Sequence, residues 1–253
     1  MLVFMTMLVA GIVIGFIGAG GAGVMIAILT TIFGVPVHTA LGTSLLTMFF
    51  TSITGSYSHI QEKNVVFSTG TIIGLFGAGG AFIGSQIAQM VPEGNLKWLT
   101  AGALTTSTIL LWFRIFTKFG VFIETWGTRG KFSSHYLWIT GSVIGVITGT
   151  VSGLFGIGAA PFIQVALLIF FGLTIQEAAG TTMFIIIPIA FIGGFGYYTI
   201  GYLDVLLFVK VVTGSMIGSY IGAKFTRWLH PTILRIAMVT SPIAGAILLL
   251  LGS

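Results

Sequence analysis

The chain has 253 residues, of which 56% are hydrophobic and only 6% are charged, and its mean hydropathy is +1.11. Because a soluble domain carries about a quarter charged residues, this composition excludes a soluble domain and predicts a polytopic α-helical membrane protein. The sequence has no cysteine, which excludes disulfides and thiolate metal sites, and we assign its net charge of +5 to cytoplasmic loops and not to nucleic-acid binding.

The first apolar segment, residues 1–33, contains the glycine cluster GFIGAGGAG at residues 15–23. An unbroken helix of that length would be about 50 Å long, whereas the hydrocarbon core is about 30 Å thick. We therefore expect the glycines to divide the segment into two helical pieces, so that the chain returns to the side it entered. Three transmembrane helices are predicted next, over residues 36–60, 66–90 and 95–116.

A hydrophilic loop then leads into a second half with the same organisation. Its long apolar segment, residues 136–171, carries the cluster GLFGIGAAP at residues 153–161, and three further helices are predicted over residues 174–199, 203–227 and 231–252. We predict a first membrane repeat, a cytoplasmic connecting loop and a second membrane repeat, at residues 1–116, 117–135 and 136–253.

The two halves align with each other without a gap at one offset. Gly15 falls on Gly153, 138 positions later, and Gly20 falls on Gly158. An offset that holds along most of each half indicates an internal duplication, which is common in transporter folds.

The positions of the basic residues predict how the repeats are oriented. With a broken helix pair and three further helices, each half crosses the membrane an odd net number of times, so the two repeats have inverted topology. A cytoplasmic connecting loop then places eight basic residues inside and two outside, whereas four simple crossings per half would give six and four. The positive-inside bias favours the inverted arrangement, with both termini outside. The inner residues are Lys63, Arg114, Lys118, Arg129, Lys131, Lys224, Arg227 and Arg235, and the outer ones are Lys97 and Lys210.

The two interruptions predict an anion site. The second piece of a broken helix begins with free N–H groups that lipid cannot satisfy, so it must be buried in protein or face a wet cavity, where its positive end attracts an anion. Two inverted copies would direct two such helix starts at a shared midplane site. The candidates are Gly18, Gly20, Gly21, Gly156, Gly158 and Ala159. The alternative is close helix packing, which we predict for the rows spaced by four, Gly70/Gly74, Gly141/Gly145/Gly149 and Gly214/Gly218/Gly222.

Hydroxyl side chains near the start of the next helix are candidates to bind the anion as well. Thr43 and Ser44 in ALGTS, with Thr181 and Thr182 in AAGTT, can donate hydrogen bonds without carrying charge. The alternative is that each hydroxyl bonds back to its own helix. Gln164 is a further candidate, although its aligned partner is apolar, so any contact with substrate would be asymmetric.

Two histidines and a tyrosine at the ends of one predicted helix each have two interpretations. His38 begins a predicted helix, and His59 and Tyr57 end it. One interpretation is a capping or interfacial role for His38 and an interfacial anchor for His59 and Tyr57, and the other is a gate or proton relay. Glu177 is expected to favour the N-terminus of its helix.

The motifs GFIGAGGAG and HTALGTS in the first half, and GLFGIGAAPF with AAGTT in the second, resemble those of the sulfite exporter TauE/SafE family, also called the toluene-sulfonate uptake permeases. The resemblance runs over essentially the whole chain, in two copies. It implies transport of sulfur oxyanions or organosulfonates, such as sulfite or sulfoacetate. The second copy departs from the pattern, because Ala159, Ala160 and Pro161 stand where the family often continues with glycines.

We therefore expect a secondary transporter of small sulfur-containing anions in the inner cell membrane, with export by alternating access as the leading prediction. We expect no enzyme, metal site or cofactor; the expected partners are the anion and the lipid bilayer, and not nucleic acid. The coupling ion, the direction and the oligomeric state, a homodimer included, stay open. Two alternatives remain: a passive anion channel, and a non-transporting scaffold that would tolerate Thr43→Val with Thr181→Val.

Overall fold

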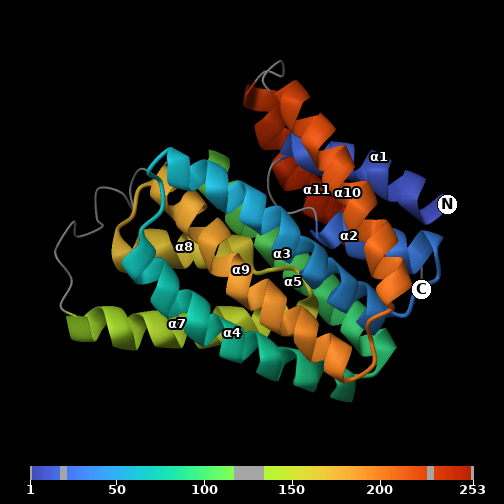
Figure 1. The fold of residues 1–253 in the computed structure, drawn as a ribbon, viewed down its shortest axis with the longest axis horizontal. Helices are drawn as coiled ribbons and strands as arrows, with labels where there is room; N and C mark the ends of the chain where they lie inside the picture. The colour runs from blue at the N-terminus through green and yellow to red at the C-terminus, as the bar shows by residue number, and fades with distance from the viewer. Residues whose placement is uncertain (1, 18–21, 117–133, 227–230, 252–253) are drawn as a thin grey trace.

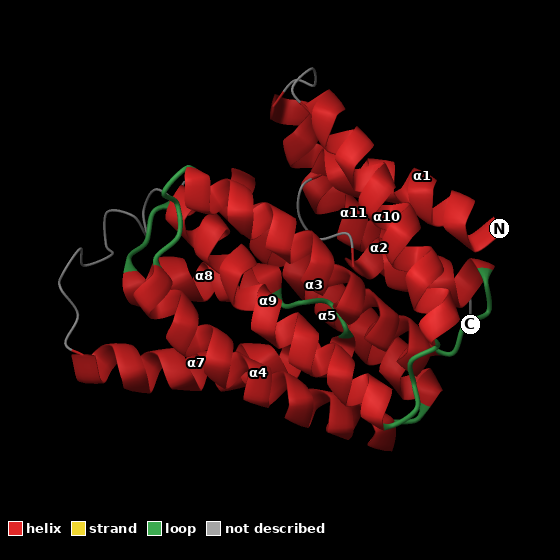
Figure 2. Ribbon diagram, in the orientation of Figure 1, coloured by secondary structure: helices red, strands yellow, loops and turns green. Residues whose placement is uncertain are grey.

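The computed structural model describes residues 2–17, 22–116, 134–226 and 231–251. Across these ranges the regular structure is helical and contains no strand (Figure 2). Within the described ranges four helices are long and apolar enough to cross a membrane, namely Phe67–Met90, His135–Phe155, Gln176–Thr199 and Val205–Gly222. The all-α part of the predicted fold class is therefore confirmed.

The helices follow the two-part order expected from the sequence (Figure 1). The six predicted single helices agree with the observed ones to within two residues at each end. The first half contains α1 (Leu2–Ile17), α2 (Ala22–Ala27), the π-helical turn η1 (Ile28–Ile32), α3 (Val37–Gln61), α4 (Phe67–Met90) and α5 (Glu93–Phe116). The second contains α7 (Ser134–Phe155), α8 (Ala160–Phe171), α9 (Ile175–Thr199), α10 (Val205–Thr226) and α11 (Pro231–Leu251).

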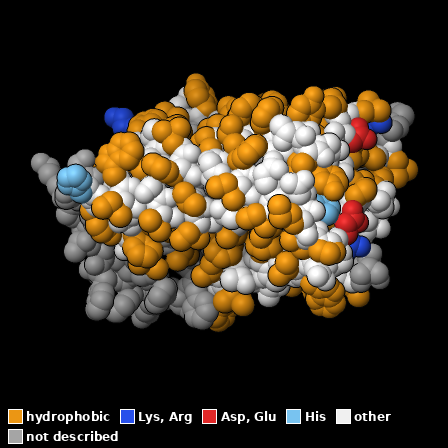
Figure 3. Space-filling model, turned by 90° about the horizontal axis from the view of Figure 1, so that it is seen from below, with side chains coloured by type: hydrophobic (Ala, Val, Ile, Leu, Met, Phe, Trp, Pro, Cys, Tyr) orange, Lys and Arg blue, Asp and Glu red, His pale blue; other side chains and the backbone are white. Residues whose placement is uncertain are grey.

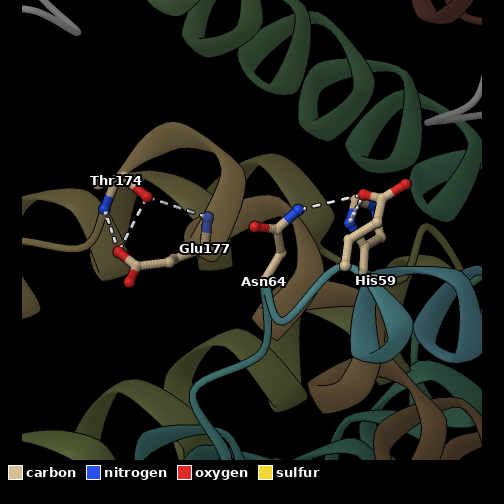
Figure 4. Close-up of polar contacts among 5 residues, drawn as sticks. His59, Asn64, Thr174 and Glu177 are labelled. Carbon is tan, nitrogen blue, oxygen red and sulfur yellow. Dashed lines mark hydrogen bonds and ion pairs between the residues drawn. The ribbon is translucent and has the colours of Figure 1, made fainter.

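Local chemistry explains where the central helices start. Pro36 precedes α3, where its fixed φ suits a helix entry. At α9, the Thr174 hydroxyl accepts from the Glu177 N–H at 3.2 Å, and the Glu177 carboxylate accepts from the Thr174 N–H at 2.8 Å (Figure 4). This capping box satisfies donors that a helix start otherwise leaves free. The expectation that Glu177 favours its helix N-terminus is confirmed.

Two parallel helix pairs are held together by glycine. Gly80 of α4 lies against the backbone of residues 146–150 in α7, and Gly218 of α10 lies against residues 8–12 in α1. These two contacts are equivalent at the 138-residue offset. In both, a Cβ would meet backbone atoms of the partner, so only glycine permits this approach. Gly145, Gly149 and Gly214 lie in the same two interfaces, so packing is confirmed for these rows.

The helices α3 and α9 form an antiparallel pair through the middle of the molecule (Figure 1). Gly42 lies against Tyr197, and Gly180 lies against His59. Since Gly42 aligns with Gly180 and His59 with Tyr197, each contact is the repeat-exchanged equivalent of the other. Exchange of the two halves therefore maps α3 onto α9 and α9 onto α3, and the two contacts change places.

The two halves differ in how the flanking helices meet this central pair. Gly70, Gly74 and Gly77 of α4 face α9, where a Cβ would meet Phe184, Pro188 and Ile189. The aligned positions of α10 hold Phe208, Val212 and Ser215. Larger side chains hold α10 away from α3, and the α10–α3 interface is accordingly much smaller than the α4–α9 interface.

The surface also fits a membrane-spanning protein. The face drawn in Figure 3 is largely hydrophobic, and the coloured charged side chains lie toward its two ends. Lipid-facing positions on α4 include Leu75, Ile83 and Met90, whose side chains are exposed. The start of α1, the end of α11 and the turns after η1, α4 and α9 lie at one end of the molecule (Figure 1).

Candidate functional site

The candidate site is the interruption between α7 and α8. The helix α7 ends at Phe155 and α8 begins at Ala160, with Gly156 and Gly158 at φ values of 67° and 68°. Glycine adopts this left-handed region without the steric clash that other residues meet there. Ala159 also has a positive φ, 49°, which is uncommon for a residue with a Cβ.

The start of α8 offers buried hydrogen-bond donors. The N–H groups of Gly158, Ala159 and Ala160 make no hydrogen bond to another described residue. These residues are all buried, Ala159 completely so. Free N–H groups at a helix start carry partial positive charge, so this arrangement suits an anion.

One face of α3 covers the interruption. Leu41 lies against Gly156, the Ser44 hydroxyl donates to the Gly156 carbonyl at 2.8 Å, and the Met48 thioether lies over Gly158. The spacing of three and four residues puts these side chains on the same side of the helix. Ser44 and Gly156 are thus brought together, two residues that the sequence placed at one site.

Thr43 and Gln164 are both buried, but Thr43 is one residue from Ser44 on α3, so its side chain points about 100° away from that of Ser44 and off the face that covers the interruption. The Thr43 side chain is completely buried, and its hydroxyl has no hydrogen-bond partner among the described residues. Gln164, in the second turn of α8, is 4% exposed. A buried hydroxyl without a partner is destabilising by about 1–3 kcal/mol, so removal of the Thr43 hydroxyl is not expected to lower stability.

Thr181 and Thr182 lie elsewhere. The Thr181 hydroxyl accepts from the Val66 N–H at 3.0 Å at the start of α4, and Thr182 donates to the Ala178 carbonyl of its own helix at 2.6 Å. The antiparallel register puts Thr181 opposite position 58 of α3, about 22 Å from the level of Thr43 at 1.5 Å per residue. The described residues therefore do not bring the two hydroxyl pairs to one point. Thr182 follows the alternative of bonding to its own helix.

The first glycine cluster is only partly visible. Gly18, Gly20 and Gly21 lie outside the described residues. The flanking helices α1 and α2 end and begin on either side of them, at Ile17 and Ala22.

His38 is buried where three helices approach one another. Its Nε2–H donates to the Ala88 carbonyl at 2.9 Å, its Nδ1 lies 3.6 Å from a Glu93 carboxylate oxygen, and its ring stacks on Tyr202 at 4.7 Å. That hydrogen bond is to the last turn of α4 and not to α3, so the capping or interfacial role stays a prediction. The histidine instead links the start of α3 to the end of α4 and the start of α5.

His59 and Tyr57 lie at the opposite end of α3. His59 Nδ1 is 3.8 Å from a Glu62 carboxylate oxygen, which also accepts from the Asn64 side chain (Figure 4). Tyr57 is 64% exposed, as an interfacial anchor would be. Neither contacts the α7–α8 interruption among the contacts described, so a gate or proton relay stays a prediction.

Tyr197 is a site residue that the sequence did not reveal. It is completely buried, and its hydroxyl donates to the Gly153 carbonyl at 2.9 Å, with the Leu154 carbonyl at 3.4 Å. The available signal was its alignment with His59 in the other half, which puts a polar ring at both positions. The long reach from α9 to the end of α7 could not be read from that alignment.

The fold and site together define a helical multi-pass membrane protein whose interrupted helix presents buried donors. The sequence matches the description "Sulfite exporter TauE/SafE" over residues 3–249. The chain belongs to this family, as its motifs had indicated, and it is a membrane transporter.

Curated relatives extend over nearly the whole chain. It is 45% identical to the probable membrane transporter protein YdhB of Bacillus subtilis, over 99% of this chain and 100% of that protein. It is 26% identical to the probable membrane transporter protein YunE of B. subtilis, covering 97% and 95%, and 27% identical to the probable membrane transporter protein MJ0441 of Methanocaldococcus jannaschii, covering 92% and 90%. No solved structure matches the chain.

Proposed function

We propose that the protein is a secondary transporter, working as an exporter, that carries small sulfur-containing anions such as sulfite, sulfoacetate or another organosulfonate across the inner cell membrane. The observation that carries this proposal is the buried start of α8, with N–H groups that have no described partner. The family description, which names sulfite, supports the substrate class.

Binding at this site relies on dipoles and hydroxyls. A helix start contributes about 0.3–2 kcal/mol toward an anion, and each hydrogen bond to a charged group contributes about 1.5–3 kcal/mol. The Thr43 hydroxyl, buried and unpartnered in the described structure, is suited to supply one such bond. A site without a fixed cation holds the anion weakly enough to release it, as transport requires.

The helix arrangement supports the inverted repeat. Exchange of the halves relates α3 to α9, and these two helices are antiparallel. If a two-fold axis relates the halves, equivalent helices are antiparallel only when that axis is perpendicular to them. We infer that the repeats at residues 1–116 and 136–253 have opposite orientations in the membrane. The start of α3 and the end of α9 are then outside, with both chain termini.

The register revises the predicted midplane site. Because Thr43 and Thr181 lie at different depths, each repeat contributes its own half-site, and alternating access exposes them in turn to the two sides. Met48 covers the interruption at Gly158 in the described state, so its thioether must move before an anion binds.

The substrate proposal is tested with purified full-length protein. We expect sulfite and sulfoacetate to raise the melting temperature more than taurine, sulfate or chloride, and labelled sulfite to leave loaded liposomes only when the protein is present. If no sulfur anion raises the melting temperature and none crosses the liposomes, the proposed function is wrong.

A variant pair links that result to the site. Thr43→Val keeps the shape and removes the unpartnered hydroxyl, so we expect sulfite affinity to fall about tenfold while the ligand-free protein becomes no less stable. Thr108→Val is the matched control, because its buried hydroxyl donates to the Leu104 carbonyl of its own helix. Equal sulfite affinity in Thr43→Val and the unmodified protein would remove Thr43 from the site.

A further inference from the structure

A helix interruption leaves both hydrogen-bond donors and hydrogen-bond acceptors of the backbone unpaired. The first turn of the second helix leaves N–H donors, and the last turn of the first helix leaves carbonyl acceptors. In membrane transporters the donors meet anionic substrate groups, whereas the unwound carbonyls coordinate cations such as Na⁺. The interruption between α7 and α8 can therefore select an anion only if its carbonyls are occupied.

Carbonyls on both sides of Phe155, where α7 ends, accept hydrogen bonds from hydroxyls of other helices. The Gly153 carbonyl accepts from the Tyr197 hydroxyl at 2.9 Å, with the Leu154 carbonyl as a weaker second acceptor at 3.4 Å. The Gly156 carbonyl accepts from the Ser44 hydroxyl at 2.8 Å. These acceptors are taken, while the N–H groups at the start of α8 have no described partner.

We propose that the Tyr197 and Ser44 hydroxyls determine the sign of charge that this interruption accepts, by occupying the carbonyls that would otherwise bind a cation. The two residues are positioning and selectivity residues that act through the backbone. The inference rests on the proposed function, because it concerns the same interruption.

Packing shows that the two hydroxyls are specifically placed. Both side chains are completely buried, one on α9 and one on α3. Tyr197 fits only because the neighbouring position on α3 is Gly42, where a Cβ would lie 2.7 Å from the tyrosine Cβ. A phenylalanine would fill the same space, and a buried hydroxyl is unfavourable unless it is hydrogen-bonded. The hydroxyl therefore serves the carbonyls and not the packing.

The test measures anion affinity of the purified full-length protein in sodium salts and in salts of the bulky cation N-methyl-D-glucamine. The unmodified protein is expected to bind sulfite equally in both. In Tyr197→Phe the freed carbonyl repels the anion, so affinity in the N-methyl-D-glucamine salt falls about tenfold, and Na⁺ bound at that carbonyl restores part of it. Tyr198→Phe is the matched control, because Tyr198 is 53% exposed on the same helix.

A second pair of variants protects the test against poor folding of Tyr197→Phe. Ser44→Ala is expected to show the same loss and the same rescue by Na⁺, whereas Ser44→Thr retains the hydroxyl and should show no dependence of its affinity on Na⁺. Tyr197→Phe and Ser44→Ala proteins that bind sulfite with unchanged affinity in both salts would overturn the inference. A lowered melting temperature with unchanged affinity would also overturn it, because that result indicates packing alone.

A panel of anions, measured with the same variants, separates this inference from the substrate proposal. If sulfite and sulfonates fail to bind but another anion, such as nitrate or phosphate, binds with the same dependence on Tyr197, the substrate is wrong and the inference holds. If sulfite binds without any dependence on Tyr197 or Ser44, the inference is wrong and the substrate holds. If the unmodified protein binds no anion of the panel, both are wrong.

Discussion

At the level of single residues, Gly158 is the position where backbone conformation and access to the site coincide. Its φ of 68° suits glycine, and a Cβ there would overlap the Met48 thioether. We expect Gly158→Ala to lower transport about tenfold, because the left-handed conformation alone is unfavourable by about 1–2 kcal/mol for alanine. The measurement is sulfite efflux from proteoliposomes at matched protein density.

A double variant separates the two causes. Gly158→Ala with Met48→Ala removes the overlap and leaves the backbone strain, so transport should recover only in part. Gly79→Ala is the control, since a Cβ there meets nothing within 4 Å. Full activity of Gly158→Ala alone would show that the interruption tolerates a side chain and that Met48 does not cover it.

Individual site residues were predictable to different degrees. Ser44 was predictable as a site candidate because it follows Thr43, two turns after the helix start that Pro36 marks, and the structure puts it on Gly156. Tyr197 could not be placed there, because its hydrogen bond joins α9 to α7. The periodicity of a sequence does not say how two helices are aligned with each other. The distance between Thr43 and Thr181 could not be predicted either, since alignment of the halves establishes equivalence and not distance.

At the level of helices, glycine decides which pairs pack closely. Gly149 of α7 lies against the backbone of Gly77 in α4, where a Cβ would come within 2.7 Å of its Cα atom. We expect Gly149→Ala to lower stability by about 1–3 kcal/mol, because the two helices must separate. Thermal unfolding of the purified protein measures the change.

The duplication supplies a second test of the same contact. Gly11 aligns with Gly149 and lies against Ser215 of α10, so Gly11→Ala should destabilise the protein to a similar extent. Gly102→Ala, where a Cβ meets nothing within 4 Å, should be neutral or slightly stabilising. A melting temperature of Gly149→Ala equal to that of Gly102→Ala would contradict backbone-to-backbone packing of α4 and α7.

Helix boundaries were the most predictable part of the fold. Apolar runs with recognisable ends, such as Pro36 before α3 and the Thr174–Glu177 capping box before α9, give local signals that tertiary contacts reinforce. Rows of glycine at a spacing of four predicted close packing but not the partner helix. That each such row packs on a helix of the other half emerges only in three dimensions.

At the level of the whole molecule, the two halves have a corresponding order of helices but differ in packing. The glycines of α4 bind that helix closely to α9, whereas Phe208 and its neighbours hold α10 away from α3. An interface with few buried contacts opens at a lower free energy than one that is tightly packed. We therefore expect the α1–α10 pair to move relative to the central helices at the α3–α10 interface during transport.

Cross-linking tests this motion cleanly, because the chain has no cysteine of its own. Phe50 of α3 and Phe208 of α10 have ring centroids 6.1 Å apart, so Phe50→Cys with Phe208→Cys can be joined by a short, cleavable thiol reagent. We expect cross-linking to reduce sulfite transport at least tenfold and reductive cleavage to restore it. The restored activity shows that loss of the rings is not the cause.

The control joins the closely packed pair. Phe67 of α4 and Phe184 of α9 have ring centroids 5.4 Å apart, and cross-linking of the corresponding cysteines should leave transport unchanged, because these helices move as one unit. If the α4–α9 link stops transport and the α3–α10 link does not, the interface that moves is α4–α9, and our assignment to α3–α10 is wrong. If neither link affects transport, the anion passes without relative motion of these helices, as a channel would allow.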